Sequence, residues 1–194
     1  GKPQPLIVTD SINGVSVLSS PDTLKSLSKI TVSGHVTDKD GNLLSNYDGI
    51  VFPTVYDKYK TKYTLGQDPN SPVMAFQSQN NIIYKGKATV TKGYFSFSFV
   101  VPKDIDYNLG KGKISYYSHD QNSNNYGYDT TIVVGGVDPN GINDVLGPQI
   151  DLFMNDENFA SGGVTNTRPL FIAQVNDDNG INTTGNGIGH DITL

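Results

Sequence analysis

The segment 176–194 holds the densest set of side chains that could carry out chemistry. Its sequence, NDDNGINTTGNGIGHDITL, contains three aspartates and places His190 directly beside Asp191. A histidine next to a carboxylate can act as a general base or help to hold a metal ion. Aspartate, asparagine and glycine at such density are also typical of tight turns. The segment is therefore either a reactive site or a turn that leads into a strand, and the elements around it must decide.

A second aspartate-rich segment, Asp38-Lys39-Asp40-Gly41-Asn42, has the opening of a calcium-binding loop. An EF-hand loop requires glycine at its sixth position and a bidentate glutamate at its twelfth. Leu43 and Gly49 occupy these two positions here, so the segment fails the motif twice. We predict instead a hairpin turn that follows a strand over residues 29–36, because Asp-Gly favours such turns. Residues 176–180 are interpreted in the same way, and a calcium ion there stays open as the less favoured alternative.

The three histidines, His35, His119 and His190, raise the question of a serine-histidine-aspartate triad. We expect His35 to lie in a strand and cover a sheet face, and His119 to end a strand before a loop at 121–125. The sequence contains neither a Gly-x-Ser-x-Gly nucleophile motif nor a His-Glu-x-x-His zinc motif. It contains no cysteine, which excludes disulfides, thiolate metal ligands and a cysteine nucleophile within this chain. We therefore predict no catalytic, cofactor-binding or metal-ligating residue, and no cofactor.

A group of tyrosines offers a different kind of site, a platform on which sugar rings could stack. Tryptophan, the usual stacking residue of such platforms, is absent, and a β-sheet protein also needs aromatic residues in its core. A carbohydrate-binding module is therefore kept as the alternative function, and it predicts that at least two of these tyrosines form a row facing solvent. The tyrosines are Tyr107, Tyr116, Tyr117, Tyr126 and Tyr128.

The charge of the chain argues against a nucleic-acid partner. The net charge is -5 and the pI is about 5.0, whereas nucleic-acid binding needs a clustered basic face. The longest basic cluster, Lys58–Lys62, stands beside Asp57 and is predicted to be a solvated loop or strand edge. No run approaches the ~20 apolar residues of a membrane helix. The first residues also lack the pattern of a secretion signal, so any such signal would lie outside this sequence.

The strands that must position these residues are indicated by alternating polarity. In residues 93–101, Phe95, Phe97 and Phe99 alternate with polar residues, which predicts a strand with one buried face. Residues 81–91 form a second such segment, and Thr91-Lys92-Gly93 between the two predicts a hairpin turn.

The remaining pattern predicts an all-β chain. Helix signals are confined to residues 20–27, where Pro21 could open about one or two helical turns. Residues 57–78 are polar and are interpreted as a long loop of undetermined role, and Pro53 suggests an edge strand or a bulge. Closely spaced strands without helices between them indicate an immunoglobulin-like antiparallel β-sandwich. Its further predicted strands are 29–36, 50–56, 113–118 and 129–134.

A shift in composition predicts a second domain. Glycine and proline in residues 135–147 are typical of a linker, which would end an immunoglobulin-like domain at residues 1–134. Residues 148–194 would then begin a second immunoglobulin-like β domain, with predicted strands over 147–154, 169–175 and 187–194. That length is about half of the ~100 residues of a β-sandwich. We therefore expect the second domain to be truncated.

At this point the sequence resembles a known family, the PorU-type sortases of the bacterial type IX secretion system, which are related to gingipains. The similarity is to the region downstream of their peptidase domain, and Gly187-Ile188-Gly189-His190-Asp191 is its most specific part. It is carried by residues 22–29, 81–88, 94–105, 112–118, 147–156, 159–163, 180–185 and 187–192.

The resemblance implies a function for the parent protein. PorU-type proteins are cell-surface cysteine peptidases, and they remove the C-terminal sorting domain of secreted cargo and transfer the cargo to anionic lipopolysaccharide. Their catalytic histidine and cysteine would lie upstream, so His190 is not assigned that role. This chain is then expected to be a non-catalytic scaffold on the extracellular face of the outer membrane. Its expected partners are the upstream peptidase domain, cargo sorting domains and secretion-system proteins. A module that polymerises by strand addition is a third alternative.

Overall fold

A computed structural model describes residues 6–19, 23–120, 123–143, 146–179 and 181, and the strands dominate it. The chain divides into two compact units, a first one up to Ile142 and a second one over Asn143–Ile181. Within the described ranges, no helix is long and apolar enough to cross a membrane. The elements of the first unit are β1 (Ile7–Ile12), β2 (Val15–Ser16), a 3-10 turn (Val17–Ser19), β3 (Leu24–Ser26), β4 (Lys29–Val36), β5 (Gly49–Tyr56), β6 (Lys60–Tyr63), β7 (Ala75–Ser78), β8 (Ile82–Lys85), β9 (Ala88–Thr91), β10 (Tyr94–Val100), β11 (Gly110–Lys111), β12 (Lys113–His119), β13 (Asn124–Asp129) and β14 (Val133–Val137).

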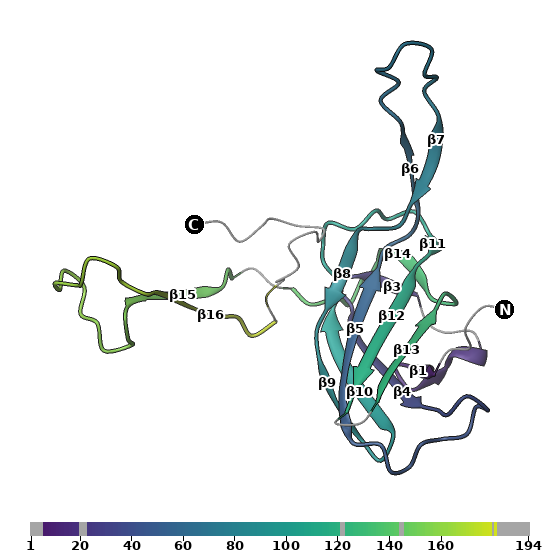
Figure 1. Ribbon diagram of the computed structural model, residues 1–194, viewed down its shortest axis with the longest axis horizontal. Helices are drawn as coiled ribbons and strands as arrows, with labels where there is room; N and C mark the ends of the chain where they lie inside the picture. Colours follow the sequence, from purple (N-terminus) through teal and green to yellow (C-terminus); the bar gives the residue numbers. More distant parts are fainter. Residues whose placement is uncertain (1–5, 20–22, 121–122, 144–145, 180, 182–194) are drawn as a thin grey trace. The chain divides into compact units, whose positions relative to one another are not determined.

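One curled antiparallel sheet forms the body of the first unit (Figure 1). Its strands follow the order β13-β12-β5-β9-β10-β4-β1-β2, and β8 also pairs with β5. The curl brings β1 back to β13, where the Leu6 N–H donates a hydrogen bond to the Tyr126 carbonyl at 2.9 Å. The all-β antiparallel prediction is confirmed. A small separate sheet of the order β11-β14-β3 accompanies the curled sheet, and an immunoglobulin-like sandwich is not confirmed.

The core lies inside the curl and is rich in aromatic rings. Phe95, Phe97 and Phe99 all point inward from β10, as their alternation predicts. Tyr84 stacks on Phe97 and Phe99, with ring centroids 5.5 and 4.7 Å apart. Tyr116 meets Phe97 edge-on at 6.5 Å, from the strand opposite. Aromatic contacts therefore join β10 to β8 and β12 across the interior.

The predicted hairpin is present as β9 and β10. Lys92 and Gly93 both have positive φ, 51° and 82°, which is the conformation that a two-residue hairpin turn needs. The Lys92 N–H donates to Asp48 Oδ1 at 2.8 Å and fixes the turn against the residue before β5. The predicted strand 81–91 is nevertheless interrupted, because β8 ends at Lys85 and β9 begins at Ala88.

This interruption explains why Pro53 is tolerated in a central strand. β5 pairs with β12 along one side and with β8 and β9 along the other, so the predicted edge position is wrong. The Pro53 carbonyl accepts a hydrogen bond from the Gly86 N–H at 3.2 Å, at the break between β8 and β9. Because N–H and C=O of one residue point to the same side in this ladder, the missing donor of Pro53 faces that break. The alternative prediction, an irregularity, is found nearby between Val55 and Tyr56.

Three further local predictions are corrected. The described part of 20–27 is not helical, since β3 pairs in parallel with β14 and buries Leu24 completely. The predicted strand 129–134 is broken, because the Asp129 carboxylate accepts hydrogen bonds from Thr131 N and Oγ1 at 2.7 Å and ends β13 in a turn. The predicted loop at 57–78 contains a hairpin, β6 paired with β7. At residues 20–27, long-range pairing and burial override the local helix signal. At Asp129, hydrogen bonds to the side chain form a turn that overrides the local strand signal.

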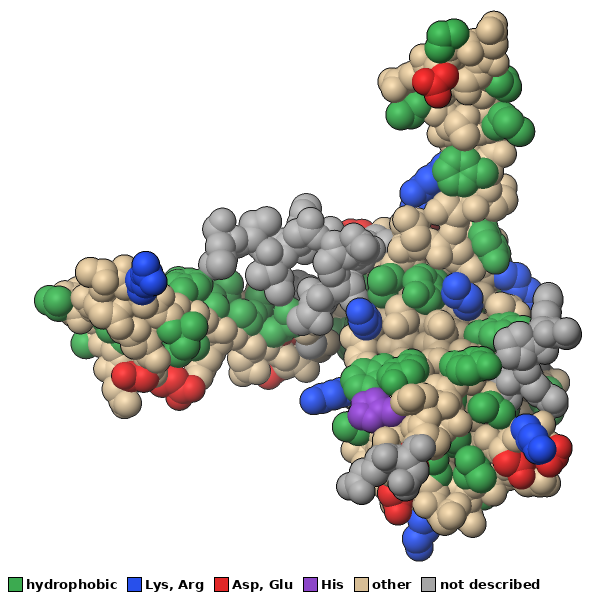
Figure 2. All heavy atoms as spheres, viewed as in Figure 1, with side chains coloured by type: hydrophobic (Ala, Val, Ile, Leu, Met, Phe, Trp, Pro, Cys, Tyr) green, Lys and Arg blue, Asp and Glu red, His purple; other side chains and the backbone are tan. Residues whose placement is uncertain are grey.

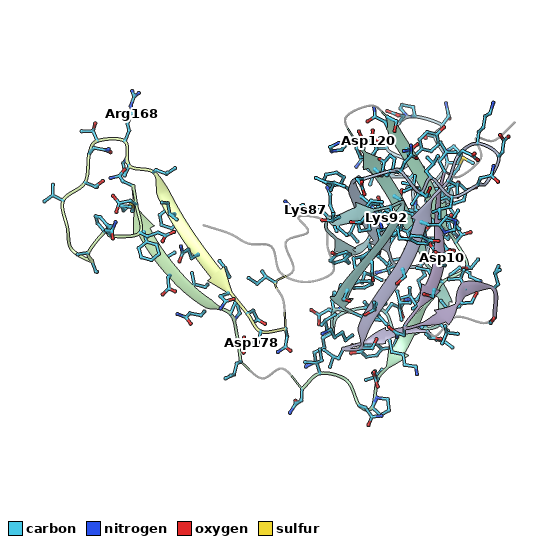
Figure 3. The ribbon with its side chains drawn as sticks, turned by 90° about the horizontal axis from the view of Figure 1, so that it is seen from below. Asp10, Lys87, Lys92, Asp120, Arg168 and Asp178 are labelled. Atoms are coloured by element: carbon cyan, nitrogen blue, oxygen red, sulfur yellow. The ribbon has the colours of Figure 1, made fainter. Side chains whose placement is uncertain are left out.

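The second unit contains one ribbon of two antiparallel strands, β15 (Gln149–Met154) and β16 (Phe171–Asn176). These confirm two of the strands predicted there. Arg168 lies in the loop that joins them (Figure 3). The predicted strand 187–194, and His190 with it, lies outside the described residues. The predicted boundaries at 134, 135–147 and 148 stay predictions.

Candidate functional site

His119 packs against aromatic side chains of the sheet. It ends β12, and its ring stacks on Phe52 with centroids 5.6 Å apart and planes 17° apart. The Tyr117 ring lies 5.9 Å away on the same strand. These contacts make His119 one member of an aromatic group on the sheet.

His35 covers a face of the sheet, as predicted, and it does so beside a carboxylate. His35 Nδ1 lies 2.8 and 2.9 Å from the two carboxylate oxygens of Asp10. Asp10 sits at the irregularity of β1 between Thr9 and Ser11, which turns its side chain toward β4. Both side chains remain partly exposed. In the part of the chain that the structure describes, no three histidine, aspartate or glutamate residues gather to hold a metal ion.

In each of the two aspartate-rich turns, a carboxylate accepts a hydrogen bond from a backbone N–H group of the same turn. Asp38 Oδ1 accepts hydrogen bonds from the Asp40 and Asn42 N–H groups at 2.8 and 2.9 Å, which confirms the predicted turn. The Asn42 hydrogen bonds hold the pKa of the exposed Asp38 carboxyl below its usual value. Asp177 Oδ1 likewise accepts the Asn179 N–H at 2.8 Å.

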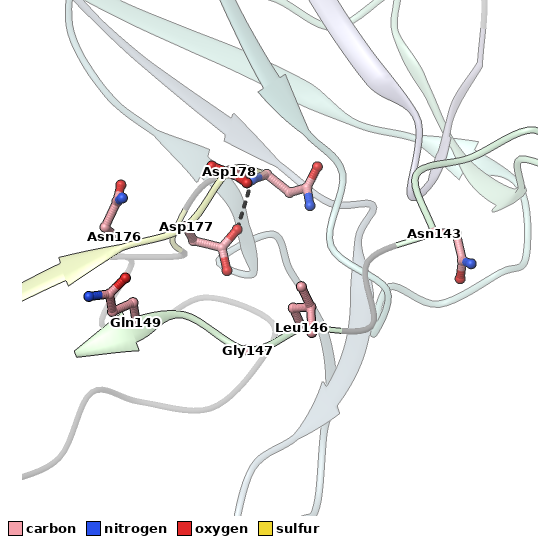
Figure 4. A pocket seen from close by; sticks show the side chains of 8 residues that line it. Asn143, Leu146, Gly147, Gln149, Asn176, Asp177 and Asp178 are labelled. Carbon is pink, nitrogen blue, oxygen red and sulfur yellow. Dashed lines mark hydrogen bonds between the residues drawn. The ribbon is translucent and has the colours of Figure 1, made fainter.

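The second turn borders a cavity of about 310 Å³ in the second unit (Figure 4). Its acidic lining consists of Asp177 and Asp178, and the other lining side chains are neutral. Calcium takes six to eight oxygen ligands with several carboxylates among them. The described lining residues therefore offer two carboxylates, and a calcium ion at residues 176–180 stays a prediction. It is lined by Asn143, Leu146, Gly147, Gln149, Asn176, Asp177, Asp178 and Asn179.

A row of aromatic side chains crosses the outer face of the curled sheet. Tyr117 of β12 is paired directly with Phe52 of β5 on one side and with Tyr126 of β13 on the other. Cross-strand partners lie on the same face, so these rings form one row over three strands. Tyr128 and His119 flank the row on the same face. We call these five residues the aromatic surface.

The tyrosines of the sequence prediction separate into different environments. Tyr117, Tyr126 and Tyr128 are each about half exposed on the aromatic surface, so the solvent-facing row that would favour the carbohydrate alternative is present. Tyr116 is buried in the core, where its hydroxyl lies 2.8 Å from Thr9 Oγ1 and burial raises its pKa. Tyr107 lies elsewhere and donates to the Lys103 carbonyl.

Sequence reasoning missed Phe52 as a member of this row. Alternation along β12 alone assigns Tyr116 and Tyr117 to opposite faces. The register that sets Phe52 beside Tyr117 depends on pairing between strands far apart in the sequence, which no local pattern specifies.

Basic residues accompany the aromatic surface. Lys85 is paired with Thr54, and Lys113 is paired with Tyr56, with Lys113 Nζ 4.4 Å from the centre of the Tyr56 ring. Lys87 is exposed in the break between β8 and β9. Figure 2 shows green side chains with a purple histidine and blue side chains over β5 and β12, while red side chains lie lower on this face.

The predicted solvated cluster Lys58–Lys62 is only partly solvated. Lys58 is nearly buried, and its Nζ donates to Asp57 Oδ1 at 2.8 Å and to the Asp106 carbonyl at 2.7 Å. Asp57 is fully buried, and its carbonyl accepts a hydrogen bond from Gln79 Nε2. These bonds tie together the two ends of the β6–β7 hairpin, so Lys58 has a structural place at its base.

Comparison with known proteins identifies what this fold resembles. Neither a protein-family model nor a curated protein matches the chain. A solved structure does: the crystal structure of dimeric latent PorU from Porphyromonas gingivalis, at 36% sequence identity and a TM-score of 0.69. The chain matches a region of PorU. The predicted resemblance is therefore confirmed in both sequence and fold.

The match extends over nearly all of this chain but over a small part of PorU. It covers 96% of this chain and 18% of the PorU chain. This chain lacks cysteine, so a cysteine nucleophile of a PorU-like protein must lie in another part of that protein. The aromatic surface, which does not require such a nucleophile, is the candidate functional site of this region.

Proposed function

We propose that this chain is a non-catalytic scaffold and interaction region of a PorU-like sortase. The observation that carries the proposal is the match at 36% identity over nearly the whole chain to a minor part of PorU. The scaffold would be immunoglobulin-like in its first unit and would continue into a second β domain. It would brace an upstream peptidase domain and offer a surface to cargo sorting domains or secretion-system proteins at the cell surface.

The reading frame that encodes this chain tests the proposal first. A cysteine peptidase domain encoded immediately upstream is the expected result, and a frame without one overturns the proposal. Bracing is then measured as the melting temperature of that peptidase domain with and without this region joined to it. A higher melting temperature in the joined protein supports bracing. Equal melting temperatures leave only the interaction role, which is tested by measuring binding to cargo sorting domains.

A second candidate, a carbohydrate-binding module, is favoured by the exposed row of Tyr117 and Tyr126. Exposed aromatic rings can stack on the apolar faces of sugars. Calorimetry with lipopolysaccharide glycans tests it. Glycan binding that is lost in Tyr117→Ser supports this function. If no tested glycan produces a heat of binding, the function is rejected.

A further inference from the structure

We propose that the aromatic surface binds an acidic segment of a partner protein. The inference rests on the proposed interaction role and names the chemistry of the partner. The first argument is charge. The chain carries a net charge of -5, yet the outward positions of β5, β8, β9, β12 and β13, all of them described, hold no carboxylate. They hold Lys85 and Lys113 instead, with Lys87 exposed between β8 and β9. A basic face on an acidic chain attracts an acidic partner.

The surface has a basic end and an acidic end. Lys85 and Lys113 lie at one end of the rows, beside Thr54 and Tyr56. Asp48 precedes β5 and Asp120 follows β12, so both lie at the other end, because the two strands are antiparallel. Their carboxylates accept hydrogen bonds from Lys92 N and Ser123 N. The acidic residues of the partner are therefore expected over the two lysines.

The middle of the surface supplies apolar anchors. Tyr117, Tyr126 and Tyr128 are each about half exposed, and Ile50 is exposed next to them on β5. Exposed tyrosines at the centre of a patch, with cations at its margin, have the composition of protein interfaces, where aromatic residues carry much of the binding free energy. The partner segment should therefore place apolar side chains beside its acidic ones.

The arrangement of the rings favours a protein over a sugar. A sugar stacks on a free ring face, but Phe52 and His119 stack on each other with planes only 17° apart. Tyr117 is tilted by 34° to Phe52 and by 43° to His119, so the rings form an uneven ridge. Side chains of a polypeptide fit between such tilted rings, whereas sugar stacking favours ring faces that lie free and in one plane.

Fluorescence anisotropy with labelled probes tests the inference on the whole chain. The probes are a short peptide of alternating Glu and Leu, a matched peptide of alternating Lys and Leu, and polygalacturonate as an anionic glycan. We expect the acidic peptide to bind at least about tenfold more tightly than the basic one, a difference of about 1.4 kcal/mol. The affinity should fall with added salt, because the lysines are exposed.

Variants assign the binding to the surface. Two double variants should each lower the affinity for the acidic peptide by about tenfold or more. They are Tyr117→Ser with Tyr126→Ser, and separately Lys85→Glu with Lys87→Glu. Tyr107→Ser is the matched control for the tyrosines, and Lys29→Glu with Lys103→Glu is the control for the charge change, since these residues lie off the surface. Both controls should bind as the unmodified chain does.

Three results would overturn the inference: equal binding of the two peptides, equal loss in the controls, or binding of polygalacturonate but not of the acidic peptide. The last result would instead support carbohydrate binding by this surface. None of them affects the bracing role, which is measured separately by the melting temperature of the joined peptidase domain.

Discussion

At the scale of single residues, two adjacent tyrosines show how the sheet separates structural from surface roles. Tyr116 points into the core and pairs its hydroxyl with Thr9 Oγ1 at 2.8 Å. Tyr117, one position later, points outward and donates a hydrogen bond to Asn124 Oδ1 at 3.0 Å in an exposed position. The same chemical group is thus buried in one case and exposed in the other, which gives a matched pair for measurement.

Tyr116→Phe should destabilise the first unit by about 1–2 kcal/mol, because it removes a buried hydrogen bond and leaves the Thr9 hydroxyl without this partner. Tyr117→Phe should change the free energy of unfolding by less than about 0.5 kcal/mol, as is usual for exposed positions. Urea unfolding followed by circular dichroism measures both. Equal losses in the two variants would refute the assignment of Tyr116 to the core.

The pKa of Tyr116 predicts a loss of stability in alkali. Burial raises this pKa in the folded state above the value of about 10 for an unfolded chain. Below that value the phenol is neutral in both states, so its contribution is fully present. As the pH rises further, the unfolded state ionises first and is favoured. Urea unfolding at about pH 9 and about pH 11 should show a larger fall for the unmodified chain than for Tyr116→Phe. An identical fall would contradict the prediction.

At the scale of elements, two close contacts hold the first unit in its form. The curl depends on Gly127, where an added Cβ would lie 2.2 Å from the Ile7 carbonyl oxygen. The β6–β7 hairpin depends on the buried pair of Lys58 and Asp57 at its base.

Gly127→Ala should destabilise the first unit by about 3 kcal/mol, because its methyl group meets backbone that cannot rotate away. Gly147→Ala is the control, since nothing lies within 4 Å of the position that its Cβ would take. Thermal unfolding measures both variants. If Gly127→Ala has the same melting temperature as the unmodified chain, the contact between β1 and β13 is not close.

Lys58→Met should cost about 3 kcal/mol or more, because it leaves the fully buried Asp57 without its counter-ion. Lys60→Met, on the exposed strand β6, removes the same charge and should cost little. Chemical unfolding compares the two, and limited proteolysis of the hairpin shows whether its base has loosened. Similar costs for the two variants would mean that the Lys58 pair does not anchor the hairpin.

The sequence predicts features that depend on neighbouring residues and fails where distant strands decide. Alternation identifies β10 and its buried phenylalanines, and the Lys92-Gly93 pair identifies its turn, since both signals are local. The place of Pro53 beside a break in the next strand, and the strand at Leu24, depend on pairing that no local pattern contains. The aromatic surface was half predicted for the same reason, with its tyrosines found and Phe52 missed.

At the scale of the whole molecule, the chain is a β-sheet region that matches a minor part of a much longer protein. In the described residues, Asp38 accepts hydrogen bonds within a turn, Asp57 forms a buried ion pair with Lys58, and Asp10 contacts His35. Its most distinctive surface is aromatic and basic. The proposed account therefore assigns binding and bracing to this region, and bond cleavage to another part of the parent protein.

The most direct test of this account is to incubate the purified chain with a type IX cargo protein that carries its sorting domain. Mass spectrometry then measures the mass of the cargo over time. The account predicts that the cargo stays intact, whether or not it binds. Cleavage of the sorting domain by this cysteine-free chain would contradict it.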